Sequence, residues 1–236
     1  MKKTFLALTG MLFMLQLSTV AQDDDKDRIE GSGHLITKDF PVQSFDEIKS
    51  GGVFHVILSQ GSKEGVKIEA DDNLMDLFEV KNEGSKLIVK MKKGSNFNSK
   101  NKMKVYISFK KLKYMDLSMV GGLTSENNLT FDELTIDNKS VGSIDISMTA
   151  QTLTVDNRSV GEVKLNGKAE KAVIKNKGVG SFHASGLVVQ TMNIENTGVG
   201  HAEVNAEKEL TVKDSFLGKV RNKGAATVKR LGKASI

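Results

Sequence analysis

The sequence has 236 residues, enough for one large domain or two small ones. It contains 34 Lys and Arg against 29 Asp and Glu, 22 Gly, one Pro, no Cys and no Trp. The absence of Cys excludes disulfides and Cys-ligated metal centres. Four of the basic residues are Arg, and no aromatic cluster accompanies them, which argues against a nucleic-acid partner.

Residues 1–21 are predicted to be a signal peptide. Lys2 and Lys3 precede the apolar stretch FLALTGMLFMLQL, and the small residues that follow fit a cleavage site after Ala21. The acidic stretch QDDDKDRIE at 22–30 is predicted to be a flexible linker. No second apolar run follows, so we expect an exported chain with no integral membrane segment after cleavage.

Residues 31–111 predict a β-rich N-terminal part. Short alternating runs such as VFHVILSQG and MKVYISF are separated by turn clusters such as GSKEG and NEGS. No Pro/Gly-rich linker divides this part from the residues that follow, so we expect one continuous body.

Residues 112–236 contain tandem copies of one short sequence motif. LTIDNKSVGSIDISM at 134–148 returns as LTVDNRSVGEVKLNG, AVIKNKGVGSFHASG, MNIENTGVGHAEVNA and LTVKDSFLGKVRNKG. Val-Gly pairs begin at 120, 141, 160, 179 and 199, and Leu-Gly pairs follow at 217 and 231. A period of about 19–20 residues with strand-like alternation predicts an all-β fold, a parallel β-helix or β-solenoid in which each copy is one rung.

Alignment of the copies gives each column of the repeat an expected role. Two alternating positions before the Val-Gly pair, and two after it, are apolar and are predicted to face the core. The Val column is expected to plug the corner, and the Gly column to permit a positive φ or a close approach. The Asn column is expected to form a hydrogen-bonded ladder between rungs; its members are Asn138, Asn157, Asn176 and Asn196.

The outward columns hold the candidate chemistry. Asp137 and Asp156 lie one rung apart, as paired carboxylates of a glycosidase could, but no sequence feature buries them or raises a pKa. His183 and His201 lie on outward columns without the Cys or carboxylate partners of a metal site. The sequence therefore predicts no catalytic, cofactor-binding or metal-binding residues, and no cofactor.

One basic column is a candidate strip for an anionic ligand. Lys139, Arg158 and Lys177 stack in successive copies, and stacked like charges cost stability unless an anion lies beside them. A solvated turn is the alternative interpretation of the same three residues.

Three features of the chain resemble the head GIN domain family. They are the segment FDEIKSGGVFHVILSQGSKEGVKIEADDNLMDLFEV at 45–80, the stretch LIVKMKKG that follows it, and the Gly-containing β repeats. Members of this family are exported bacterial proteins labelled auto-transporter adhesins. The resemblance covers residues of about 31–236 and implies a right-handed β-solenoid with a surface or periplasmic binding role. The label rests on analogy of fold.

The sequence thus predicts an exported, non-enzymatic binding protein that acts as a cell-surface adhesin. Its partner would be an envelope or host glycan, or a protein, and its location the periplasm, the outer-membrane surface or the extracellular space. Two alternatives stay open: a periplasmic structural or envelope-stress component without a glycan ligand, and a glycan-active β-helix enzyme.

Overall fold

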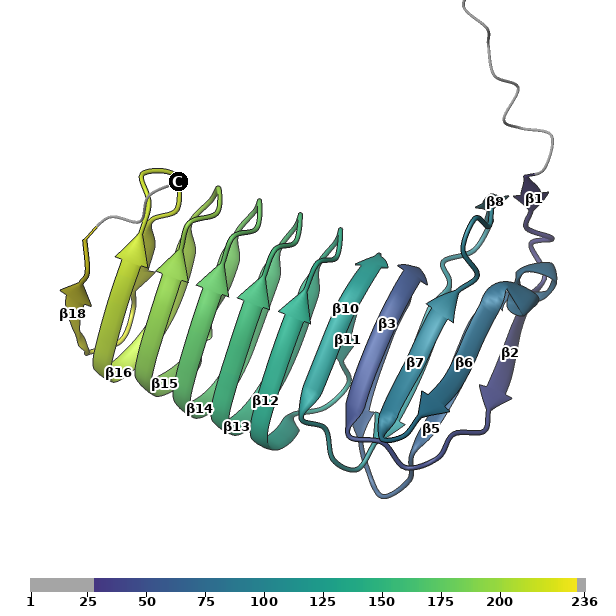
Figure 1. The fold of residues 1–236 in the computed structure, drawn as a ribbon, viewed down its shortest axis with the longest axis horizontal. Coiled ribbons are helices and arrows are strands. Elements are labelled where there is room, and N and C mark those ends of the chain that lie inside the picture. The colour runs from purple at the N-terminus through teal and green to yellow at the C-terminus, as the bar shows by residue number, and fades with distance from the viewer. Residues whose placement is uncertain (1–27, 233–236) are drawn as a thin grey trace, which may run out of the picture.

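The computed structural model of the chain describes residues 28–232. Strands make up 66% of the structure and helix 3%. The one helix among the described residues is the 3-10 helix η1 (Asp72–Leu77). Figure 1 shows parallel strands stacked side by side along one long axis. No helix among the described residues is long and apolar enough to cross a membrane. The predicted signal peptide, residues 1–21, lies outside the described residues.

The repeats form the regular part of the stack. Their strands are β12 (Leu129–Asn138), β13 (Ile144–Asn157), β14 (Val163–Asn176), β15 (Phe182–Asn196) and β16 (Ala202–Asp214). Each pairs in parallel with the next, so that Asn138 lies opposite Asn157, Asn157 opposite Asn176, and Asn176 opposite Asn196. Each long strand begins in one sheet, bends, and ends in the opposite sheet before a corner turn starts the next coil (Figure 1). The fold is the predicted β-solenoid.

The apolar columns predicted to face inward are buried in every copy, because alternate residues of a strand point to the same side. Before the corner these are Leu134, Leu153, Ala172, Met192 and Leu210, with Ile136, Val155, Ile174, Ile194 and Val212. After the corner they are Ile144, Val163, Phe182, Ala202 and Val220, with Ile146, Leu165, Ala184 and Val204. No copy encloses a core of its own, so each rung is stabilised by its neighbours.

The N-terminal part continues the same parallel ladders. One coil consists of β3 (Glu47–Val53) and β4 (His55–Gln60), and the coil after it of β10 (Tyr114–Val120) and β11 (Leu123–Ser125). On the other side, β3 pairs in parallel with β7 (Lys86–Met91), and β4 with β9 (Lys104–Phe109). The coil that contains β7 and β9 therefore lies outside the coil of β3 and β4, although it comes later in the sequence. After β9 the chain passes the β3/β4 coil and begins β10 on its other side.

Antiparallel strands cover the N-terminal end of the stack. Here β6 (Phe78–Glu83) pairs with β7, β5 (Gly65–Asp71) pairs with β9, and β2 (Leu35–Phe40) pairs with β5. At the other end, the short strands β17 (Val220–Asn222) and β18 (Thr227–Arg230) pair with β16. Short or antiparallel end strands interrupt the parallel template on which further chains could add.

One sequence expectation needs correction. The linker predicted at 22–30 does not extend to its last residues, because β1 (Ile29–Glu30) pairs in parallel with β8 (Phe97–Asn98); residues 22–27 lie outside the described residues. The last Leu-Gly pair lies after β18, where the Leu231 N–H donates to the Val212 carbonyl.

The corner glycines are required by both conformation and space. Gly142, Gly161, Gly180 and Gly200 have φ between +130° and +138°, a region that side chains with a Cβ rarely adopt. A Cβ on Gly161 would also collide with the carbonyl oxygen of Gly142 in the rung below, and the same holds at Gly180 and Gly200. The Gly column lets each corner lie directly on the previous one.

We predict that Gly161→Ala lowers the free energy of unfolding by at least about 2 kcal/mol, through strain and the backbone collision. Gly61→Ala is the matched control, because a Cβ there meets nothing within 4 Å; its effect should stay within about 0.5 kcal/mol. Chemical denaturation of both variants measures the difference. Equal stability of the two variants would contradict the assigned role of the corner.

Candidate functional site

The column of asparagines lies inside the corner turns. Asn138, Asn157, Asn176 and Asn196 are all buried. The side-chain amide of Asn138 donates to Oδ1 of Asn157 at 2.7 Å, Asn157 to Asn176 at 2.7 Å, and Asn176 to Asn196 at 2.8 Å. Each link joins one rung to the next, so the column ties adjacent corners together.

The same asparagine side chains also form hydrogen bonds with residues of the corner turns. Oδ1 of Asn138 accepts from the backbone N–H of Ser140 at 3.1 Å, and Oδ1 of Asn157 accepts from the Ser159 hydroxyl at 2.8 Å. A buried polar group without such a partner would cost stability. The asparagines therefore have a structural task and are not available to a ligand.

The Val column is exposed, and the expectation that it plugs the corner is wrong. Alternation continues from the buried Asn138 through exposed Lys139 and buried Ser140, which places Val141 on the outside. Val141, Val160, Val179 and Val199 are each 49–51% exposed. Counting from the Asn column would have predicted this orientation.

The predicted basic strip lies beside this row of valines. Lys139 Nζ contacts Asp137 at 2.9 Å, and Arg158 contacts Asp137 at 3.1 Å and Asp156 at 3.2 Å. Lys177 is exposed and forms no ion pair with any described residue. Carboxylates of the neighbouring column thus already compensate two of the three charges, and a bound anion is not needed to relieve repulsion between them.

Asp137 and Asp156 are not arranged as an acid and a base. Desolvation works to raise the pKa of Asp137, but hydrogen bonds and charge from Lys139 and Arg158 outweigh it and hold that pKa below its ordinary value. A general acid of a glycosidase needs a raised pKa. An ionised Asp137 between two cations does not meet that requirement.

Asp71 is the one buried carboxylate among the described residues. Its Oδ1 accepts from the Asn101 amide at 2.5 Å, and its Oδ2 accepts from the Lys100 backbone N–H at 3.1 Å. The Asn101 hydrogen bond, helped by Lys100 and Gly33, outweighs desolvation and lowers the pKa of Asp71. This carboxylate fastens the loop before β9 to the end of β5.

The two outward histidines lie on neighbouring rungs. His183 Nε2 lies 3.6 Å from a Glu162 oxygen, and the His201 carbonyl accepts from the Phe182 N–H at 3.0 Å. Within residues 28–232, no group of three or more His, Cys, Asp or Glu side chains could hold a metal ion.

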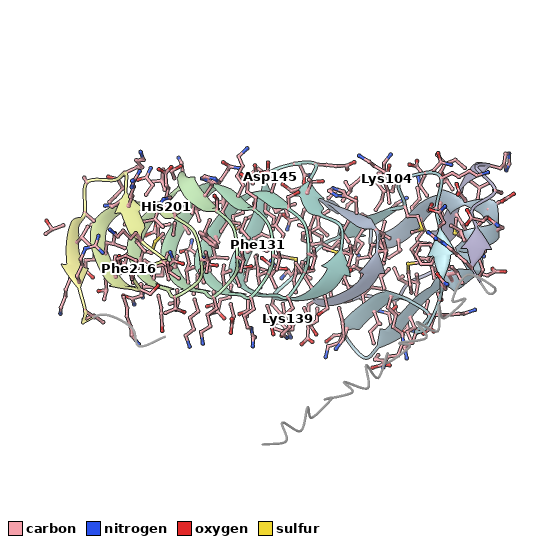
Figure 2. The ribbon with its side chains drawn as sticks, turned by 90° about the horizontal axis from the view of Figure 1, so that it is seen from above. Lys104, Phe131, Lys139, Asp145, His201 and Phe216 are labelled. Carbon is pink, nitrogen blue, oxygen red and sulfur yellow. The ribbon has the colours of Figure 1, made fainter. Side chains whose placement is uncertain are left out.

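Two hollows lie near the N-terminal end. One, of about 940 Å³, is lined by polar and charged residues of β2, β5 and β9, Tyr106 among them. The other, of about 570 Å³, is more apolar, and Val53, Phe97 and Val120 contribute to it. The repeats themselves present long rows of side chains: Lys139 lies along one long edge in Figure 2, and Asp145 and His201 along the other.

Comparison with known proteins decides the family. A family model described as "Putative auto-transporter adhesin, head GIN domain" matches residues 44–226. The chain belongs to the head GIN domain family. No curated protein matches the chain.

Solved structures of similar proteins agree with the fold of this head GIN domain protein. A putative adhesin from Bacteroides fragilis is 31% identical, with a TM-score of 0.76 over 86% of this chain and 100% of the other. A putative adhesin from Parabacteroides distasonis is 24% identical, with a TM-score of 0.63 over 87% and 96%. A putative lipid binding protein from the same species is 19% identical, with a TM-score of 0.62 over 86% and 95%. The last two show the fold alone.

We predict that Asn157→Ala lowers the free energy of unfolding by about 1–3 kcal/mol, because it leaves the Asn138 amide without its acceptor and the Asn176 carbonyl without its donor. Lys177→Ala, an exposed position in the next turn, should change it by less than about 0.5 kcal/mol. Denaturant titration of both variants tests this. A loss for Asn157→Ala no larger than for the control would refute the role of the column.

A second prediction concerns pH. Because the folded-state pKa of Asp71 is lowered, its contribution is present above the unfolded-state pKa and is lost as the pH falls through the folded-state value. Asp71→Asn should therefore be less stable than the native protein by about 1.5–3 kcal/mol at neutral pH. The gap should narrow as the pH falls below about 4. Denaturant titrations at several pH values measure it, and a gap independent of pH would contradict the assignment.

Proposed function

We propose that this protein is exported and acts as a non-enzymatic, adhesin-like binding protein, whose partner is a glycan or another protein. The observation that carries the proposal is the division between inward and outward columns. The inward columns are filled with apolar side chains or hydrogen-bonded asparagines, whereas the outward columns other than the exposed Val column are mostly polar and charged. Solenoids of this kind bind through extended surfaces.

The family supports the same proposal. The family model and the B. fragilis structure both carry adhesin in their descriptions. The lowered pKa values of Asp71 and Asp137 offer no support to the alternative of a glycan-active enzyme. Within the proposal, Lys139, Arg158 and Lys177 are the candidate contacts for an acidic group of the partner, and Lys177 is the most available of the three.

Location is the first test. Intact cells treated with an added protease should lose the protein if it acts at the surface, whereas a periplasmic control protein should survive. Survival of this protein as well would exclude surface adhesion and favour the alternative of a periplasmic structural component.

Binding is the second test. On a glycan array and in a panel of envelope proteins, Lys139→Glu/Arg158→Glu/Lys177→Glu should weaken binding to acidic partners by about tenfold or more, since each contact reverses from attraction to repulsion. Lys168→Glu/Lys171→Glu/Lys208→Glu is the matched control, with the same charge change on exposed residues at the opposite bend. Equal loss in both variants would remove the strip as a specific contact.

Turnover of a polysaccharide that disappears in Asp137→Ala would overturn the non-enzymatic assignment.

A further inference from the structure

The exposed valines form one straight apolar row along the corner turns. Parallel bridges join Val120, Val141, Val160, Val179 and Val199 in succession. Val53 pairs with Val120 at one end, and the Leu217 carbonyl accepts from Gly200 at the other. All seven residues are 44–52% exposed. With rungs about 4.8 Å apart, the row is about 29 Å long. We call it the valine ridge.

The backbone alone does not require an apolar side chain at these positions. A β-branched residue suits a bridged corner, but Thr meets that need and is polar. Thr is frequent at another outward column, three positions before the Asn column, where the five copies read Thr135, Thr154, Val173, Asn193 and Thr211. At the ridge, every copy is Val or Leu. This points to an apolar environment outside the protein.

The ridge is narrow and lies along the corner turns. It is one side chain wide, and the residues two positions away on either side are mostly polar or charged. Two such ridges in contact would bury far less than the roughly 1,200 Å² of a stable protein–protein interface. A fluid apolar phase needs no matching groove, since it closes around whatever projects into it.

The charges beside the ridge favour an anionic surface. The positions within two residues of the row include four cations but only one carboxylate, Glu162. The cations are Lys139, Arg158, Lys177 and Lys219. The carboxylates that pair with Lys139 and Arg158 lie farther from the ridge, on the strands before the turns. Asp137 is 20% exposed and Asp156 40%, against 44% for each cation. A surface that touches the ridge therefore meets the cations first.

An exposed aromatic residue ends the ridge. Phe216, beside Leu217, is 77% exposed, and Figure 2, which looks down on the corner turns, shows it at the C-terminal end of the molecule. At this column the other copies have the small buried residues Ser140, Ser159, Gly178 and Gly198. Phe216 instead faces solvent, as aromatic side chains at a membrane–water interface do.

We propose that the valine ridge is a membrane-contact surface. The side chains of the ridge and Phe216 insert into the headgroup region of a lipid bilayer. The lipid phosphates are contacted by Lys139, Arg158, Lys177 and Lys219. This goes beyond the proposed recognition of a glycan or protein partner and does not depend on it. The contact is peripheral and reversible, because shallow burial of one row adds to a modest electrostatic attraction.

Flotation with lipid vesicles tests the proposal. The purified exported protein should float with vesicles of equal parts phosphatidylglycerol and phosphatidylcholine, less with phosphatidylcholine alone, and less as salt is added. Val120→Thr/Val141→Thr/Val160→Thr/Val179→Thr should weaken binding about tenfold or more while keeping β-branched residues at the corners. Val173→Thr is the matched control, since Val173 is 39% exposed but lies off the ridge; it should bind as the native protein does.

Val160→Thr alone, expected to weaken binding by about twofold to fourfold, keeps the test valid if the fourfold variant is unstable. Three results would overturn the proposal. The ridge variants could bind vesicles as tightly as the native protein does. The control could lose as much affinity as the ridge variants. The native protein could ignore vesicles and form, by light scattering, a dimer that the ridge variants lose, which would assign the ridge to a second copy of the chain.

Discussion

The structure depends on the corner turn, where each rung must lie directly on the one before it. A Cβ on the glycine of a corner would strike the carbonyl oxygen of the previous glycine, so the close stacking exists only because glycine occupies the column. The asparagine amides then link the same corners from inside. Next to the superimposed corners the strands pair in register, as Asn138 does with Asn157 and Asn157 with Asn176.

Register at the corner determines whether each of the other columns points into the core or toward solvent. With Asn138, Asn157 and Asn176 inside, strict alternation buries the apolar positions of both sheets and exposes the positions between them. A slip of one residue would reverse that arrangement throughout a rung. The chain therefore varies freely only at the outward positions, and the surface on which any partner is recognised can change while the solenoid does not.

The outward surface divides into two kinds. The flat faces carry charges that pair between neighbouring rungs, as Lys164 does with Asp145 at 3.2 Å, and such exposed pairs add little stability. The ridge between them carries apolar side chains that are about half exposed. The flat faces suit a polar partner, and the ridge suits a lipid surface. The cations Lys139, Arg158 and Lys177 flank the ridge and can contact an acidic group of either.

The sequence was enough to predict the solenoid, because a period of about 19–20 residues with alternation admits few other folds. It did not predict the coil formed by β3 and β4, since a single copy at 47–60 has no repeat of its own to compare. The apolar character of the Val column predicts that it lies inside, whereas alternation through the turn from the buried Asn column leaves it outside. The ion pairs of Asp137 depend on side-chain directions at a corner, which spacing alone does not determine.

A double-mutant cycle on the asparagine column measures most directly whether neighbouring corners stabilise one another. Asn157→Ala and Asn176→Ala alter adjacent rungs, whereas Asn138→Ala and Asn196→Ala alter rungs at the two ends of the column. Adjacent members should couple by about 0.5–3 kcal/mol in the free energy of unfolding, and the end members should be additive within about 0.5 kcal/mol. Additivity of the adjacent pair would show that the corners are held by backbone pairing alone and would contradict the account.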